Sequence, residues 1–159
     1  MTASGVINGY TDGSFKPDNS ITRAEFVKIL SGMLSLPNGS GDRFSDVPTD
    51  AWFAPFVYAA SDYGIINGVS EDSFGPNNGI TREDAAVILY RVLSKKGVTF
   101  NESLGFNDNA QISDYAKTAV GSLTAGEIIK GDNGLFRPKD SLSRAETVTM
   151  LSRISGYIK

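Results

Sequence analysis

Three arginines stand at equivalent places in this chain, each one residue after a Thr or Ser that begins a helical pattern. They are Arg23, Arg82 and Arg144. A cation at a helix start is disfavoured by about a few tenths of a kcal/mol, so its recurrence at one offset indicates a role. Two roles are open. The guanidinium could pair with an acid of a neighbouring repeat, such as Asp46 or Asp108, or it could bind an external anion together with free helix N–H groups.

Composition restricts the other chemistry that the chain could perform. The 159 residues include no His and no Cys, which removes the usual general base, disulfides and the commonest transition-metal ligands. A net charge of −3 disfavours nucleic acid as a partner. No apolar run approaches the roughly 18 residues of a membrane-spanning helix, so we expect no membrane insertion.

Catalytic and metal-dependent functions are also disfavoured. A glycosidase needs two carboxylates about 5–10 Å apart, whereas the acids here fall mostly at helix caps and turns. Acidic loops such as residues 70–75 do not have the spacing of an EF-hand. We therefore predict a protein that is not an enzyme and that uses no cofactor and no metal.

The sequence repeats itself. Residues 5–25 align without gaps with residues 64–84, and 11 of 21 positions are identical. A third copy, residues 126–146, needs one insertion and one deletion. The segment before each copy, residues 44–63, recurs at 106–125 but is missing ahead of the first copy. We predict the second half of a repeat over residues 5–36 and full repeats over 44–97 and 106–157, packed as one compact body.

Each repeat has the pattern of a helix, a turn-rich loop and a second helix. Apolar residues at helical spacing indicate helices over 52–63 and, more weakly, 116–123. The loops carry one aromatic each, Phe15, Phe74 or Phe136, which we expect to hold the loop to the core. An acid three residues after each Thr or Ser completes a capping box. These patterns predict an all-α fold in which the three capped helices form a pseudo-threefold central bundle, with the first repeat truncated.

The single Trp, Trp52, falls at the start of a helical pattern. An aromatic there usually packs in the core, but this position also allows it to stack on a sugar at the edge of a groove. Its counterpart in the last repeat is Asp114.

Taken together, the recurring elements resemble S-layer homology domains over nearly the whole chain, residues 5 to about 157. The elements are Phe-x-Asp before the first helix, Gly-Ile-x-x-Gly, the Phe-x-Pro loop and the Thr-Arg-Ala-Glu helix start. The resemblance implies a helical pseudo-trimer that anchors surface proteins non-covalently to bacterial cell walls, outside the cell. Its ligand would be an anionic secondary cell-wall polysaccharide, often bearing pyruvylated N-acetylmannosamine, bound in grooves between repeats. Arg23, Arg82 and Arg144 would hold the pyruvate carboxylate.

Further contacts follow from the same resemblance. Backbone N–H groups near Gly9, Gly68 and Gly131 could approach the ligand, although a turn requiring positive φ explains these glycines equally. Lys130 would add charge. The missing half-repeat suggests a dimer partner or a fragment of a longer precursor, since Met1 to Ser4 do not resemble a signal peptide. The alternative function is a protein–protein interaction or lattice-assembly module.

Overall fold

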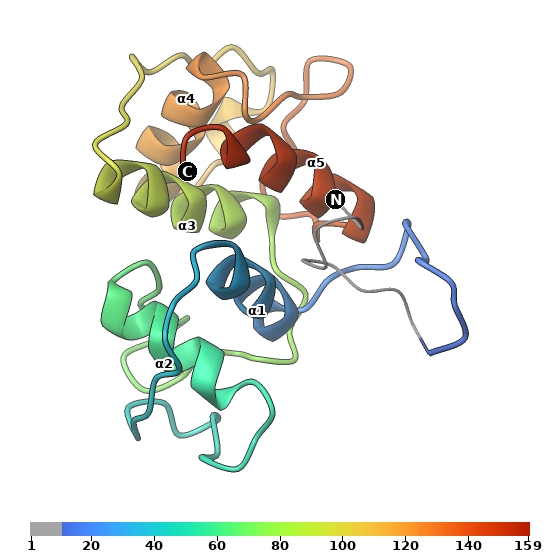
Figure 1. Cartoon of the computed structure of the whole chain (residues 1–159). Helices are drawn as coiled ribbons and strands as arrows, with labels where there is room; N and C mark the ends of the chain where they lie inside the picture. The colour runs from blue at the N-terminus through green and yellow to red at the C-terminus, as the bar shows by residue number, and fades with distance from the viewer. Residues whose placement is uncertain (1–10) are drawn as a thin grey trace. The chain divides into compact units, whose positions relative to one another are not determined.

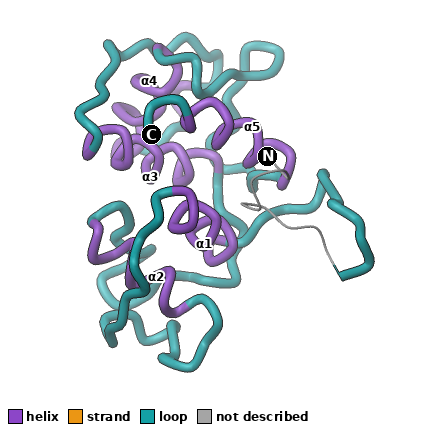
Figure 2. Tube along the Cα trace, viewed as in Figure 1, coloured by secondary structure: helices purple, strands orange, loops and turns teal. Residues whose placement is uncertain are grey.

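The computed structural model describes residues 11–159, which form helices and loops with no strand (Figure 1, Figure 2). The predicted all-α fold is confirmed for these residues. Gly9 and the predicted boundary at residue 5 lie outside them. Between the helices the chain forms only isolated bridges, such as Ser20 with Ser143. No helix in the described part has the length and apolar character needed to cross a membrane.

The chain divides into two compact units. The first unit contains Met1–Gly79 with Ser143–Ala145, and the second contains Ile80–Leu142 with Glu146–Lys159. The predicted repeat boundaries and the pseudo-threefold bundle stay predictions.

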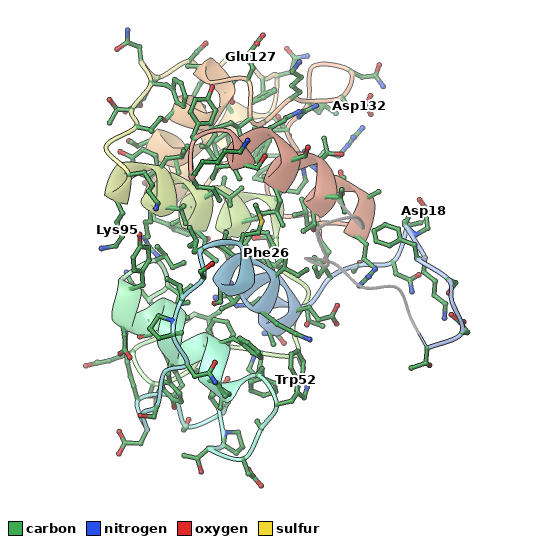
Figure 3. All side chains as sticks on the ribbon, viewed as in Figure 1. Asp18, Phe26, Trp52, Lys95, Glu127 and Asp132 are labelled. Atoms are coloured by element: carbon green, nitrogen blue, oxygen red, sulfur yellow. The ribbon has the colours of Figure 1, made fainter. Side chains whose placement is uncertain are left out.

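The first unit is built on α1 (Arg23–Met33) and α2 (Ala54–Tyr63), which pack against each other. Phe26 and Leu30 of α1 and Val57 of α2 are fully buried, and Phe26 is labelled in Figure 3. The helix predicted over 52–63 begins two residues later, because Pro55 occupies the first turn, where its missing N–H costs nothing. It ends at Tyr63, and the Gly64 that follows has a φ of 80°, which suits a residue without a Cβ.

The second unit repeats this plan. It contains α3 (Arg82–Lys95), the short helices η2 (Asn109–Gln111) and η3 (Asp114–Ala116), and α4 (Lys117–Ala125). Helix α3 packs against α4 and η3. Helix α5 (Arg144–Ser155) follows, and its Leu151 and Ile154 are fully buried.

Two of the predicted caps are present. The Thr22 hydroxyl accepts from the Glu25 N–H, and the Thr81 hydroxyl accepts from the Asp84 N–H, each over 3.2 Å. Helix α5 begins directly after Ser143, as the pattern predicts. Such caps satisfy one N–H of the first helical turn and typically contribute about 1 kcal/mol.

In two of the three turn-rich loops, a buried aromatic side chain packs the loop against its unit. Phe74 and Phe136 are 0% and 1% exposed, which confirms the prediction for these two residues. Phe74 packs on Phe44 and Phe136 on Phe106, with ring centroids 5.8 and 5.5 Å apart. Phe15 is only half-buried.

A carboxylate fixes the backbone of the same loops. Asp46 accepts hydrogen bonds from the Phe74 and Gly75 N–H groups at 2.9 and 2.8 Å, and from the Ser73 hydroxyl at 2.7 Å. Burial raises the pKa of Asp46, but these donors outweigh burial and hold it below its ordinary value.

The second unit uses Asp108 in the same way. Its carboxylate accepts from the N–H groups of Phe136 and Arg137 at 2.9 and 2.7 Å. The sequence suggested that Asp46 or Asp108 could pair with one of the three arginines. That suggestion is wrong, because both carboxylates take loop N–H groups.

We expect Asp46→Ala to lower the free energy of unfolding by about 2–4 kcal/mol. The substitution leaves the Phe74 and Gly75 N–H groups without the charged acceptor that they have in the wild-type chain. Urea unfolding followed by circular dichroism measures this loss. Asp50→Ala is the matched control, because Asp50 is an exposed acid four residues away. Equal stability of the two variants would contradict the role given to Asp46.

Candidate functional site

The three arginines make one contact in common. Each donates its Nε–H to the backbone carbonyl of a loop aromatic and lies over that residue's ring. The Nε–O distances are 2.8 Å for Arg23 to Phe74, 2.7 Å for Arg82 to Phe136 and 3.0 Å for Arg144 to Phe15. The guanidinium carbons lie 5.0, 5.3 and 4.9 Å from the ring centroids. Each of these three arginines thus binds the loop of another predicted repeat, and each contact lies within one compact unit.

The helix starts are closed by the same loops. The first two N–H groups of α1, those of Arg23 and Ala24, donate to the carbonyls of Asn78 and Pro76. Helices α3 and α5 repeat both bonds with equivalent loop carbonyls. Because the cap takes the third N–H of α1 and α3, the predicted anion site made of free helix N–H groups is not formed there. The guanidinium groups are therefore the remaining donors that could bind an anion at these helix starts.

The outer edge of two guanidinium groups faces a carboxylate. Nη1 of Arg82 bonds to Glu146, and Nη1 of Arg144 lies 3.6 Å from Glu25. The arginine side chains are 14% and 8% exposed, whereas the two glutamates are 45% and 36% exposed. Arginines therefore pair with acids, as one interpretation of the sequence held, but with Glu25 and Glu146 instead of Asp46 and Asp108.

Trp52 lies at the surface in the loop before α2, where Figure 3 labels it, and is 54% exposed. The expectation that an aromatic there packs in the core is wrong, because its neighbour Phe53 takes the buried position. The two rings meet edge to face with centroids 5.3 Å apart. The Lys28 ammonium lies over Trp52 at 5.6 Å. This places an exposed aromatic surface beside a cation.

The other predicted contacts are less informative. Gly68 has a φ of 90°, and a Cβ there would lie 2.6 Å from the Ser73 carbonyl. A Cβ on Gly131 would lie 2.5 Å from the Phe106 ring. Close packing therefore accounts for both glycines. Lys130 is exposed, and the ligand-binding role of all three stays a prediction.

One cluster of polar side chains in the second unit was not among the residues predicted from the sequence. Glu83 is 2% exposed and accepts from the Ser113 N–H and hydroxyl, each at 2.9 Å, and from the Tyr115 hydroxyl at 3.2 Å. Lys139 also bonds to this carboxylate. Glu83 stands where the other capped helices have Ala, and that charge difference was the available signal.

Gly68→Ala should destabilise the chain by about 3 kcal/mol, of which about 1 kcal/mol is left-handed backbone strain and the remainder is the backbone clash. Gly13→Ala isolates the strain, since Gly13 has a φ of 81° and nothing lies within 4 Å of the point that its Cβ would occupy. Thermal unfolding of both variants measures the difference. Equal losses would show that packing does not explain Gly68.

Comparison with known proteins assigns the family. The S-layer homology domain matches residues 1–27, 43–86 and 105–148, well over half of the chain. The surface-layer 125 kDa protein of Lysinibacillus sphaericus is 32% identical over 96% of this chain and 13% of its own length. The cellulosome-anchoring protein of Acetivibrio thermocellus is 31% identical over 92% of this chain and 34% of its own.

An enzyme carries a similar segment. The amylopullulanase of Thermoanaerobacterium thermosulfurigenes is 32% identical over 92% of this chain but only 8% of its own length. The chain therefore spans a small part of each relative. These relatives include S-layer and cell-surface proteins, which confirms the predicted localisation at the cell surface. With the matched segments recurring three times, the chain belongs to the S-layer homology domain family.

Proposed function

We propose that this chain anchors the polypeptide that carries it to the bacterial cell wall, without catalysis, by binding an anionic, pyruvylated secondary cell-wall polysaccharide. The relatives support the coarse part of this proposal. An amylopullulanase, a cellulosome-anchoring protein and a surface-layer protein differ in their named roles, yet they share this segment. A shared segment in proteins of such different activity suits attachment better than catalysis.

The observation that carries the ligand proposal is the geometry of the arginines. The Nε–H of each is fixed on a loop carbonyl, which orients the plane of the guanidinium. Partly exposed carboxylates reach the Nη1 edge of Arg82 and Arg144. A carboxylate that approaches from solvent can therefore meet this edge. Glu146 and Glu25 are themselves 45% and 36% exposed, so a ligand carboxylate can compete with them for this edge from solvent.

Pyruvate ketals suit such an edge. The ketal carboxylate is a compact anion, and a guanidinium offers two parallel donors to it. Each charge-assisted hydrogen bond contributes about 1.5–3 kcal/mol. The proposal gives this role to Arg23, Arg82 and Arg144 as a class.

The exposed face of Trp52 supports a contact with the sugar ring. Sugars present apolar C–H faces that pack on aromatic rings, and Lys28 adds a cation next to this surface. We assign Trp52 to this auxiliary contact. Gly68, Gly131 and Lys130 are kept as candidate backbone and charge contacts, with Gly68 and Gly131 already required by packing.

We propose no catalytic activity for the chain. It has no His and no Cys. The carboxylates of Asp46, Asp108 and Glu83 accept structural hydrogen bonds that hold their side chains in place.

Cell-wall sacculi test the proposal directly. The chain should co-sediment with purified sacculi from a bacterium whose wall polymer is pyruvylated. Sacculi from a strain lacking the ketal-pyruvyl transferase should bind at least about tenfold more weakly, since the loss of one charge-assisted hydrogen bond already corresponds to about a factor of ten.

Sacculi stripped of the whole polymer by hydrofluoric acid serve as the negative control. Binding that is equal on all three preparations would contradict the proposal. Equal binding together with self-association in sedimentation would instead favour the protein–protein or lattice alternative.

A further inference from the structure

Tyr115 is the most exposed of the large apolar side chains in residues 11–159, at 63%. It belongs to η3, the short helix that leads into α4. Single exposed apolar side chains are common on protein surfaces and need no explanation by themselves. Tyr115 differs from such residues because its polar end is fixed inside the second unit while its ring lies in water.

The hydroxyl of Tyr115 is anchored on the first turn of α3. It lies 2.6 Å from Oδ1 of Asp84 and 3.2 Å from Oε1 of Glu83. Burial of the hydroxyl and these two carboxylates raise the pKa of Tyr115 far above its ordinary value, so the hydroxyl remains a donor. The backbone of η3 holds one end of the side chain and the carboxylates hold the other. The ring is therefore ordered before any ligand arrives, which lowers the entropic cost of binding to it.

The equivalent position in the first unit faces the core. The two units are related by an offset of 62 residues, which carries Asp46, the carboxylate that binds the loop N–H groups, onto Asp108. At this offset Tyr115 corresponds to Phe53, which is only 7% exposed. The exposure of Tyr115 is therefore not a property that the repeat imposes on this position.

A different residue supplies the buried apolar side chain ahead of the helix in the second unit. Ile112 is buried there, whereas the same offset places the exposed Asp50 at its position in the first unit. The first unit thus buries Phe53 and exposes Asp50, and the second unit buries Ile112 and exposes Tyr115. Because Ile112 is buried, the ring of Tyr115 is available for contacts outside the unit.

Each unit consequently exposes one aromatic ring at the same distance from a helix. Trp52 stands two residues before α2 begins, and Tyr115 stands two residues before α4 begins. The sequence alignment placed Asp114 opposite Trp52, which suggested that the last repeat has no aromatic for a sugar. The second unit instead has its exposed ring one residue later.

The cations beside the two rings differ in their partners. The Lys28 ammonium lies over the Trp52 ring. The Lys139 ammonium bonds to Oε1 of Glu83, the same oxygen that the Tyr115 hydroxyl contacts. The charge of Lys139 is thus compensated by an internal carboxylate. Tyr115 therefore presents an apolar ring face without a cation dedicated to it, which suits an uncharged ligand.

We propose that Tyr115 is a second sugar-binding surface, on which an uncharged sugar residue of the wall polysaccharide stacks. This inference rests on the proposed function and deepens it, because it adds a contact in the second unit for sugars that carry no pyruvate. The apolar C–H face of a sugar packs on the ring. Glu83 and Asp84 act as positioning residues that hold the Tyr115 hydroxyl.

Spectra of the wild-type chain test the contact without any substitution. The whole chain, with carbon-13 in its tyrosine rings, is titrated with soluble wall polymer released from pyruvylated sacculi. The ring signals of Tyr115 should shift, because a sugar replaces water on the ring. Those of the buried Tyr58 should stay in place. Unchanged Tyr115 signals at saturating polymer would overturn the inference.

Tyr115→Ala should weaken binding by about fivefold or more, as measured by calorimetry. The factor should be the same for pyruvylated polymer and for polymer from the strain lacking the ketal-pyruvyl transferase, because the ring contacts an uncharged sugar. Tyr115→Phe retains the ring and should lose less. A loss confined to the pyruvylated polymer, or equal losses in the two variants, would count against stacking on an uncharged sugar.

Tyr157→Ala is the matched control, since Tyr157 is also an exposed tyrosine of the second unit. It should keep the wild-type affinity within about twofold, and thermal unfolding should show that each variant is folded. Unchanged affinity in a folded Tyr115→Ala variant, or an equal loss in Tyr157→Ala, would overturn the inference. Should Tyr115→Ala fail to fold, the spectra of the wild-type chain decide the matter.

The two proposals fail differently. A wild-type chain that binds neither the soluble polymer nor pyruvylated sacculi would overturn the proposed function, and this inference with it. Wild-type binding that leaves the Tyr115 ring signals in place would leave the proposed function intact and remove only the second sugar-binding surface.

Discussion

Both units depend on one loop residue whose backbone is bound twice, at its N–H by a carboxylate and at its carbonyl by an arginine. In the first unit Asp46 accepts the N–H of Phe74, and Arg23 donates to the carbonyl of the same residue. In the second unit Asp108 and Arg82 hold Phe136 in the same way. Each of these bonds has one charged partner, which makes it roughly twice as strong as a neutral hydrogen bond. A loop rich in Gly, Asn and Pro has little order of its own, and these contacts supply it.

Because their Nε–H groups bind loop carbonyls, the three arginines have a structural role before any role in ligand binding. Once the loop is fixed, its carbonyls accept from the first two N–H groups of α1 and α3, and the caps take the third, so these two helix starts offer no open anion site. Fixing Nε also turns the remaining guanidinium edge toward positions that carboxylates reach, as Glu25 and Glu146 show. One residue can thus order the fold and present a charge. Removing such an arginine changes stability and binding together, so measured loss of binding needs a parallel measurement of folding.

Periodic and local features of the fold could be predicted from the sequence. Apolar spacing gave the helices, Thr22 and Thr81 marked two helix starts, and the loop aromatics Phe74 and Phe136 were expected in the core. The partners of the arginines could not be predicted, because a backbone carbonyl has no sequence signature. Trp52 was misplaced since Phe53 competes for the same buried position. Glu83 carried a usable signal, a charge where the aligned helices have Ala, but only the fold shows that Ser113 and Lys139 surround it.

The most direct measurement of the central claim is the arginine Nε–H region of a nitrogen-15 spectrum of the whole chain, recorded while the pyruvylated sugar is added. Before addition, Arg23, Arg82 and Arg144 should give signals that exchange slowly with water, because each Nε–H is bonded to a loop carbonyl. On addition, signals of the ligand-binding arginines should shift without faster exchange. Rapid exchange of all three before addition, or an unchanged spectrum at saturating sugar, would contradict the account.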